Sequence, residues 1–220
     1  MKQRPQTSRV STLTGFAGGV ASVRAARRIG GGWSARGTTW IGSTLAALLL
    51  LASARAAGPE NPVVTHGSAS FQKVGNNWVI TTSNRAIIQY TSFDIAMGQW
   101  VRFVQAGGDA RVLNRINSSM PTRIDGTLMA NGSVYFVNPA GVIFGNNAVI
   151  NCGSFAAVGG QLSDTDFLAK RDNFTNLTGA VVNHGQINAQ QGGAVTLVGQ
   201  HVANYGRIVA PQGTVIMAAG

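Results

Sequence analysis

The chain has 220 residues with 17 Lys and Arg against 7 Asp and Glu, so its formal net charge at pH 7 is +10. Such a balance would suggest a nucleic-acid partner. However, eight of the basic residues lie in residues 1–57, which contain no acid, and the remainder carries 17 − 8 = 9 basic against 7 acidic residues. This distribution removes the main support for nucleic-acid binding by the body of the chain.

Residues 1–56 are organised like an extended secretory signal peptide. A long basic region rich in Gly, Ser and Arg precedes the apolar segment 45–52, and small residues follow it. A transmembrane anchor is the competing interpretation, but the apolar stretch is shorter than the roughly 18–20 residues that span a bilayer. We therefore expect the Sec translocon to be the partner of this leader.

Small residues at the end of the leader fit a signal-peptidase site. We expect cleavage between Ala56 and Ala57, with cleavage after Ala54 as the alternative. The exported domain would then comprise residues 57–220.

The single cysteine, Cys152, cannot form an intramolecular disulfide. It follows the apolar residues Val149 and Ile150, so we expect a small buried hydrophobic side chain and not a nucleophile. Stability must then come from burial and from backbone hydrogen bonds.

From residue 58 onward, short apolar runs alternate with Gly, Asn and Pro, a pattern typical of short strands separated by tight turns. The segment 58–65 contains two prolines, and we expect it to be loosely held. The expected strands are 67–71, 77–82, 86–90, 100–104, 112–116, 126–130, 133–137, 142–144 and 148–150.

A repeat near the C-terminus indicates how these strands are arranged. The sequence NHGQINA at 183–189 recurs as NYGRIVA at 204–210, an offset of 204 − 183 = 21 residues. A period of about 20 residues with several short strands in each period predicts the coils of a β-helix, because each coil buries its inward side chains only against its neighbours. The same offset would relate Gln191 to Gln212, Val195 to Ile216 and Gly199 to Gly220, and Gly126–Ala130 supplies a third Gly-x-aliphatic-x-Ala.

One segment departs from the strand pattern. In residues 163–171 Ser163 precedes Asp166 by three positions, acidic residues come early and basic residues late. This order predicts a short helix outside the stack, with its charges on a solvated face.

A tight turn is expected at Asn138-Pro139-Ala140-Gly141. Asn can cap the turn, Pro presets φ at the second position and Gly suits the fourth, as in a type I turn. By spacing alone, the turn needs no role beyond joining two strands.

Several blocks of residues follow one another through the body of the chain, and the main ones are Asn84-Arg85-Ala86-Ile87-Ile88, Val112-Leu113-Asn114-Arg115-Ile116, Ile124-x-Gly126-x-Leu128-x-Ala130-Asn131-Gly132 and Val137-Asn138-Pro139-Ala140-Gly141-Val142-x-Phe144-Gly145. In this order the blocks resemble a known family, the N-terminal secretion domain of filamentous haemagglutinin-like proteins exported by two-partner secretion, closest to the high-molecular-weight adhesin branch. The resemblance covers about residues 67–220.

The resemblance implies an all-β fold, a right-handed, single-stranded parallel β-helix with an N-terminal cap. It also implies export to the outside of a Gram-negative-type bacterium, with recognition by an outer-membrane β-barrel transporter that carries POTRA domains. The family block Asn-Pro-Asn-Gly-Ile/Leu corresponds to the secretion motif Asn138, Pro139, Ala140, Gly141 and Val142, which departs from it at Ala140 and conservatively at Val142. A second family block, Asn-Pro-Asn-Leu, has no counterpart in the chain.

Two other functions remain open at this level. A β-helix can host polysaccharide-degrading enzymes, but the acids are scattered and His66, His184 and His201 lack metal-ligand spacing, so no catalytic, cofactor or metal site is expected. A surface adhesive solenoid is the other alternative. Family members usually continue for hundreds of residues, so we expect contacts with host or neighbouring cells to lie in a passenger beyond Gly220.

Overall fold

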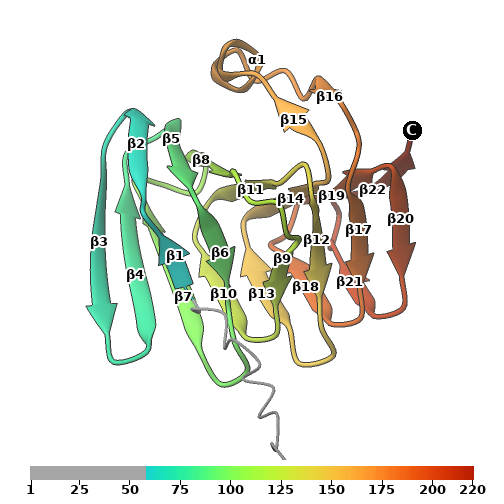
Figure 1. Ribbon diagram of the computed structural model, residues 1–220, viewed down its shortest axis with the longest axis horizontal. Coiled ribbons are helices and arrows are strands. Elements are labelled where there is room, and N and C mark those ends of the chain that lie inside the picture. The colour runs from blue at the N-terminus through green and yellow to red at the C-terminus, as the bar shows by residue number, and fades with distance from the viewer. Residues whose placement is uncertain (1–57) are drawn as a thin grey trace, which may run out of the picture. The chain divides into compact units, whose positions relative to one another are not determined.

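The computed structural model describes residues 58–220, which form a parallel β-solenoid of about six coils (Figure 1). The expected β-helix is confirmed. The leader and the cleavage site at Ala56 and Ala57 lie outside the described residues. Within residues 58–220, no helix has the length and apolar character needed to cross a membrane.

The strands fall into a cap and successive coils. The cap strands are β1 (Gly58–Glu60), β2 (Val63–His66) and β3 (Ala69–Val74). The first two coils contain β4 (Asn77–Thr82), β5 (Ala86–Tyr90), β6 (Ser92–Asp94), β7 (Trp100–Gln105), β8 (Arg111–Ile116) and β9 (Thr122–Ile124). The third and fourth contain β10 (Thr127–Ala130), β11 (Ser133–Val137), β12 (Gly141–Phe144), β13 (Val149–Cys152), β14 (Ser154–Val158) and β17 (Ala180–Asn183). The fifth and sixth contain β18 (Gln186–Ala189), β19 (Ala194–Gly199), β20 (His201–Asn204), β21 (Arg207–Val209) and β22 (Thr214–Ala219).

Corresponding strands of successive coils stack into three sheets. The first sheet has the order β21-β18-β13-β10-β7-β4-β3, the second β2-β5-β8-β11-β14-β19-β22, and the third β20-β17-β12-β9. An isolated bridge between Ile95 and Ile124 links the region after β6 to the third sheet. Each coil therefore depends on the coils before and after it for its backbone hydrogen bonds.

The stacking register confirms the 21-residue offset in two of the sheets. Asn183 pairs with Asn204 and Ile187 with Ile208. In the second sheet the prediction is wrong by one residue, because Val195 pairs with Val215 and not with Ile216, and Gly199 pairs with Ala219 and not with Gly220. The turn at 190–193 is one residue longer than the equivalent turn at 211–213, which shortens the period from 21 to 20 beyond it.

The N-terminal cap closes all three sides of the solenoid. β1 pairs antiparallel with β6, β2 with β5 and β3 with β4, whereas the strands of the coils pair parallel. The expectation that 58–65 is loosely held is therefore wrong. These residues form two cap strands, because the first coil leaves strand edges that they can pair with.

An aromatic series fills the solenoid interior. Neighbouring rings make edge contacts from Tyr90 to Phe93 at 5.0 Å, from Phe93 to Phe136 at 4.8 Å and from Phe136 to Phe155 at 6.0 Å between centroids. Cys152 is buried among apolar side chains, as predicted, and this burial raises the pKa of its thiol. The core thus consists of inward side chains stacked from coil to coil.

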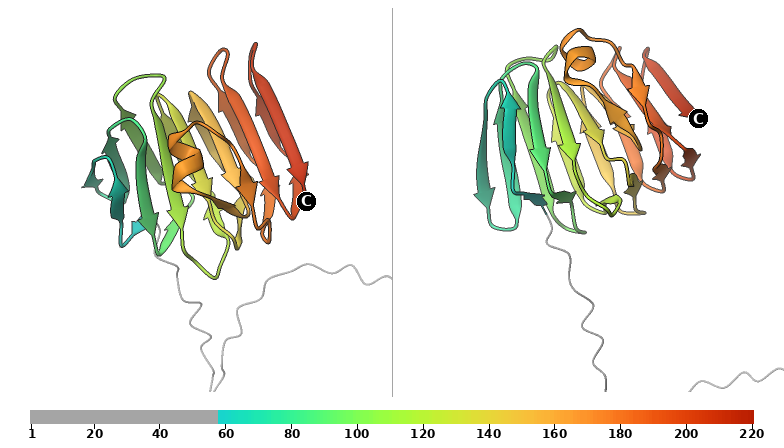
Figure 2. Two further views of the ribbon diagram at one scale, coloured as in Figure 1. Left: turned by 90° about the horizontal axis from the view of Figure 1, so that it is seen from above. Right: turned by 45° about the horizontal axis from the view of Figure 1, so that its top comes forward.

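Between β14 and β17 the chain leaves the fourth coil, and we call residues 159–179 the excursion. It contains β15 (Gln161–Leu162), α1 (Asp164–Leu168) and β16 (Phe174–Thr175), and it lies outside the stack (Figure 2). Ser163 caps α1 by accepting a hydrogen bond from the Asp166 amide, which confirms the predicted helix. The predicted basic end is wrong, since α1 stops at Leu168, before Lys170 and Arg171.

The excursion covers the outward side of the second sheet. That side is apolar across several coils, and it packs against apolar side chains of the excursion to form a second hydrophobic cluster, separate from the interior one. The cluster consists of Ile87, Leu113, Tyr135, Val137, Ala156, Val158, Leu162 and Phe167, with Leu168, Phe174 and Leu177 partly buried against it.

Candidate functional site

The predicted turn at Asn138 connects β11 to β12 and is held by the Asn138 side chain. The Gly141 amide donates to the Asn138 carbonyl at 2.8 Å, and the Ala140 amide donates to Asn138 Oδ1 at 2.9 Å. Asn138 Nδ2 donates to the Met120 carbonyl and to Thr122 Oγ1, both at 3.1 Å. Asn138 is fully buried, so its amide ties this corner to the coil before it.

The corner is also where the excursion rejoins the solenoid. Gly141 has φ of +111°, and a Cβ added to it would lie 2.5 Å from the Ala180 carbonyl oxygen, at the start of β17. Thr178 Oγ1 donates to the Pro139 carbonyl at 2.9 Å, and the Gly179 amide donates to the Gly159 carbonyl at 2.9 Å. Only glycine permits this close stacking of backbone on backbone. The motif therefore packs directly against residues 178–180, where the excursion returns to the solenoid.

A cleft of about 350 Å³ lies between the corner and the base of the excursion. Arg115 and Asn117 at the end of β8 form one side, Pro139 of the motif lies at the corner, and β15 contributes the opposite side. Pro139 and Ala140 are half-buried, whereas Asn138 is buried behind them. Two of the family-matching positions, Arg115 and Pro139, thus line one cleft.

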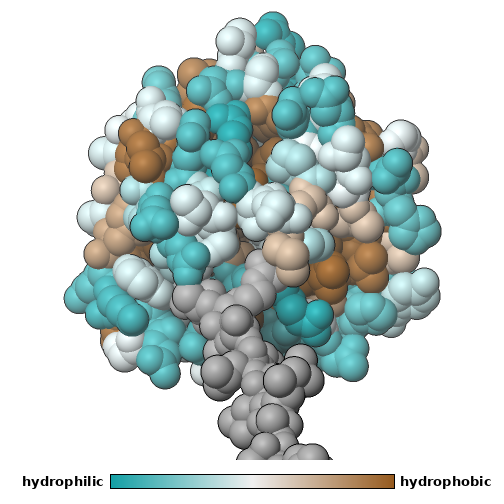
Figure 3. Space-filling view, in the orientation of Figure 1, coloured by the Kyte–Doolittle hydropathy of each residue, from teal (hydrophilic) through white to brown (hydrophobic). Residues whose placement is uncertain are grey.

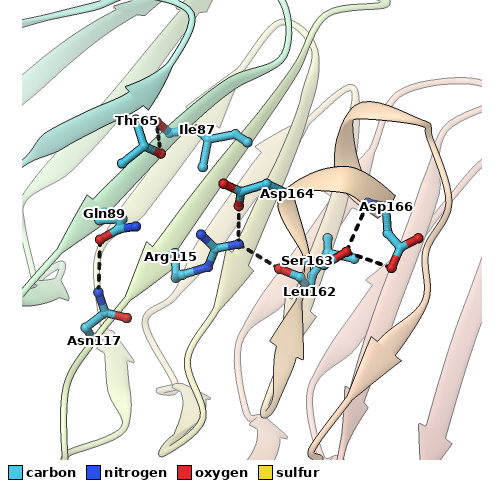
Figure 4. Close-up of polar contacts among 9 residues, drawn as sticks. All are labelled: Thr65, Ile87, Gln89, Arg115, Asn117, Leu162, Ser163, Asp164 and Asp166. Carbon is cyan, nitrogen blue, oxygen red and sulfur yellow. Dashed lines mark hydrogen bonds and ion pairs between the residues drawn. The ribbon is translucent and has the colours of Figure 1, made fainter.

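Arg115 fastens the excursion to the second coil. Its Nη2 donates to the Leu162 carbonyl at 2.6 Å and to Asp164 Oδ1 at 2.7 Å (Figure 4). In the same view Ser163 and Asp166 make their capping bonds inside the excursion. The guanidinium therefore bridges a backbone carbonyl and a carboxylate of a segment that is distant in sequence.

The other family-matching residues lie elsewhere. Asn84 Oδ1 accepts from the Arg111 amide at 3.1 Å, and the Arg85 amide donates to the Arg111 carbonyl at 2.8 Å, so this pair forms the corner before β5. Asn114 is buried in the interior, where its amide donates to the Tyr135 carbonyl and accepts from the Tyr90 hydroxyl. These residues shape coils, and the fold does not gather them with Asn138 into one site.

A second ionic contact fixes the far end of the excursion. Arg111 pairs with Asp172 at 3.0 Å, and its guanidinium also bonds the Tyr135 hydroxyl and lies 5.2 Å from the Phe167 ring centroid. Burial raises the pKa of the Tyr135 hydroxyl. The phenol therefore acts as a neutral hydrogen-bonding group at physiological pH.

Several carboxylates of the described chain form ion pairs with arginine. The pairs are Arg111–Asp172, Arg115–Asp164, Arg123–Asp125 and Arg171–Asp166. Hydrogen bonds from Ser163 and then from Arg171 lower the pKa of Asp166.

The ring of His184 stacks on the ring of Tyr205, with the ring centroids 5.0 Å apart. Residues 58–220 contain no group of three His, Cys, Asp or Glu placed to hold a metal ion.

The face seen in Figure 1, which carries β9, β12, β17 and β20, is neither uniformly hydrophilic nor uniformly hydrophobic. Hydrophilic and hydrophobic patches alternate across it (Figure 3). Outward Ile143 and Val182 are half-buried on neighbouring strands, while Arg123 is exposed beside them. The cleft beside the corner is therefore better defined by geometry than by surface hydropathy.

Comparison with known proteins decides the family. Residues 56–220 match the model of the TPS secretion domain. The chain belongs to this family. Two-partner secretion domains are parts of exoproteins secreted by Gram-negative bacteria, so the resemblance inferred from the motif blocks is confirmed.

Individual relatives agree with this family. A heme/hemopexin-binding protein of Haemophilus influenzae (strain ATCC 51907 / DSM 11121 / KW20 / Rd) is 33% identical over 195 residues, which are 83% of this chain and 21% of the relative. The crystal structure of the HMW1 secretion domain from Haemophilus influenzae superposes with a TM-score of 0.66 at 34% identity, covering 69% of this chain and 42% of that one. The chain thus spans about a fifth of the length of the heme/hemopexin-binding protein.

The residues that fasten the excursion could not be recognised in advance. Asp164 was expected on a solvated face and Asp172 carried no prediction beyond being one of the scattered acids, yet each pairs with an arginine of β8. Their partners lie 49 and 61 residues away, so no local pattern connects them. The sequence did contain one sign of this contact. Leu162 and Phe167 are large apolar residues in a mostly polar segment, and such side chains need an apolar surface to pack against.

Proposed function

We propose that this domain targets an exoprotein for secretion across the outer membrane. After the Sec translocon has moved the chain and residues 1–56 have been removed, the POTRA domains of an outer-membrane β-barrel transporter recognise the domain in the periplasm. The exoprotein then crosses the outer membrane and folds coil by coil outside, starting from this domain. Folding of successive coils outside the cell can give export its direction without nucleotide hydrolysis.

The observation that carries this proposal is the corner at Asn138. A family motif that only joined two strands would not need a buried Asn138 side chain with three hydrogen bonds. It would also not need a glycine, Gly141, that packs against the backbone of Ala180 where the excursion ends. The motif fixes the position of Pro139 beside the cleft, where a partner can reach it. We infer that the transporter engages this region through exposed backbone, by strand addition.

Secretion of matched variants through the cognate transporter tests the proposal. Asn138→Ala should reduce the amount of exported protein, because the corner loses its support. Asn151→Ala is the control, since Asn151 is exposed on β13 and makes one side-chain bond, to Asn188 at 2.8 Å. Undiminished export of Asn138→Ala, with the control also normal, would remove the corner from the mechanism.

A second assay separates recognition from folding. Pro139→Ala changes a half-buried side chain at the rim of the cleft and leaves the buried Asn138 amide in place. Binding of folded Pro139→Ala protein to the transporter's periplasmic domains should weaken, while its circular dichroism stays that of the parent. Equal binding by both proteins would show that the corner serves folding alone.

We further propose that the domain has no enzymatic activity. Asp164, Asp125 and Asp166 are each paired with an arginine, and a general acid and base need carboxyl groups free to exchange protons. Contacts with a host or neighbouring cell surface would belong to other parts of such an exoprotein. The test is an assay of the purified protein for polysaccharide cleavage, in which activity would contradict the assignment.

A further inference from the structure

The excursion makes its strongest contacts with coils that precede it in sequence. It leaves the fourth coil at Gly159, yet Asp164 and Asp172 pair with Arg115 and Arg111, both on β8 in the second coil. Between these two pairs Phe167, which is fully buried, packs edge-on against Tyr135 of the third coil at 5.5 Å between centroids. One segment therefore touches three consecutive coils.

These contacts can form only after the coils have stacked. The paired residues are 49 and 61 positions apart, and bringing them together in an unfolded chain costs loop-closure entropy. Once β8, β11 and β14 are paired, their outward side chains already lie side by side, so the excursion meets a prepared apolar surface. Its closure therefore comes last among the events in these coils.

The interior changes character at the same boundary. The aromatic series passes from Phe71 of the cap through Tyr90 and Phe136 to Phe155 of the fourth coil. In residues 186–220, which supply the fifth and sixth coils, the only aromatic residue of the Phe, Trp and Tyr class is Tyr205, which is 72% exposed. Large rings that interlock between coils couple them more strongly than small aliphatic side chains do.

We propose that the excursion is a latch that fastens the second, third and fourth coils into one cooperative unit with the cap. The fifth and sixth coils lie beyond the latch and open separately. The latch acts by holding stacked coils together, so an opening that would begin at one coil must also lift residues 159–179. This inference is independent of recognition by the transporter.

Hydrogen exchange of the purified protein, read by mass spectrometry, tests the latch. Peptides from β8, β11 and β14 should exchange at a common slow rate, and peptides from β18 to β22 should exchange at least about tenfold faster. The double variant Asp164→Asn and Asp172→Asn removes both ion pairs while keeping the side-chain size. It should speed exchange of β8 and β11 about tenfold, and each single variant about threefold.

The matched control is Asp166→Asn. Asp166 bonds Ser163, Arg171 and Asn173, all within the excursion, so its neutralisation loosens α1 without untying either end from β8. It should leave exchange in β8 and β11 unchanged.

Two results would overturn the latch. One is faster exchange of the excursion alone in the double variant, with β8 and β11 as slow as in the parent, because the segment would then only lie on the sheet. The other is a common exchange rate for all coils of the unmodified protein. Even if the double variant fails to fold, the unmodified protein and the single variants decide between these outcomes.

Discussion

Replacing Gly141 by alanine should destabilise the domain more than an ordinary glycine substitution. Gly141 has φ of +111°, a conformation that costs an L-residue about 1–3 kcal/mol. The new Cβ would also lie 2.5 Å from the Ala180 oxygen and 3.0 Å from its nitrogen, which are rigid backbone atoms. β12 and β17 must then separate, which weakens hydrogen bonds worth about 1 kcal/mol each. We expect a total loss of about 3–5 kcal/mol in the free energy of unfolding, a large part of the roughly 5–15 kcal/mol typical of a domain.

The chain provides a matched control for this experiment. Gly192 has φ of +76°, and a Cβ added there would meet no atom within 4 Å. Gly192→Ala therefore measures backbone strain alone, about 1 kcal/mol. Guanidinium unfolding followed by circular dichroism gives both values. If Gly141→Ala cost no more than Gly192→Ala, the close stacking of the corner against β17 would not contribute to stability.

Three further predictions concern the core, the thiol and the helix. Phe136→Ala should lower the free energy of unfolding by about 3–5 kcal/mol, whereas Val104→Ala on the exposed side of β7 should cost under about 1 kcal/mol, as measured by the same denaturant titration. Cys152 should resist a thiol reagent in the native protein and react at once in denaturant, because burial raises its pKa and shields it. The lowered pKa of Asp166 stabilises α1 above the ordinary carboxyl pKa, so this contribution is lost as the pH falls below about 4. Protection of residues 164–168, taken as the ratio of the intrinsic to the observed exchange rate at each pH, should fall there in the parent and show no such pH step in Asp166→Asn.

Much of the coil architecture could be predicted because the residues of each strand and of the turns beside it indicate that strand by themselves. The alternation in β7 and the Gly and Asn residues that end β10 and β12 give strand positions without knowledge of their partners. The one-residue register error arose because a turn changes length without disturbing the strands beside it. Repeats report which residues stack only as far as the next change in turn length.

The excursion and the cap could not be predicted in the same way. Leu113 directly follows the inward Val112, and Tyr135 lies in the continuous apolar run 134–137, so the sequence does not distinguish the outward, covered side of these strands from the interior. The cap strands β1 and β2 contain or follow a proline, and their pairing depends on edges formed much later in the chain. Asn138 was recognisable as a turn residue, but its partners Met120 and Thr122 follow only from the stacking.

The cap gives the solenoid a direction. Antiparallel strands close its first end on all three sides, and they resist further pairing through Pro59 in β1, the bulge in β2 and Lys73 on β3. Coils can therefore be added only toward the C-terminal side, in the order in which the sequence supplies them. A chain that folds while it leaves a pore needs such an order, because each new coil must find its template already formed. The latch, closing over the second to fourth coils, then keeps that template from reopening.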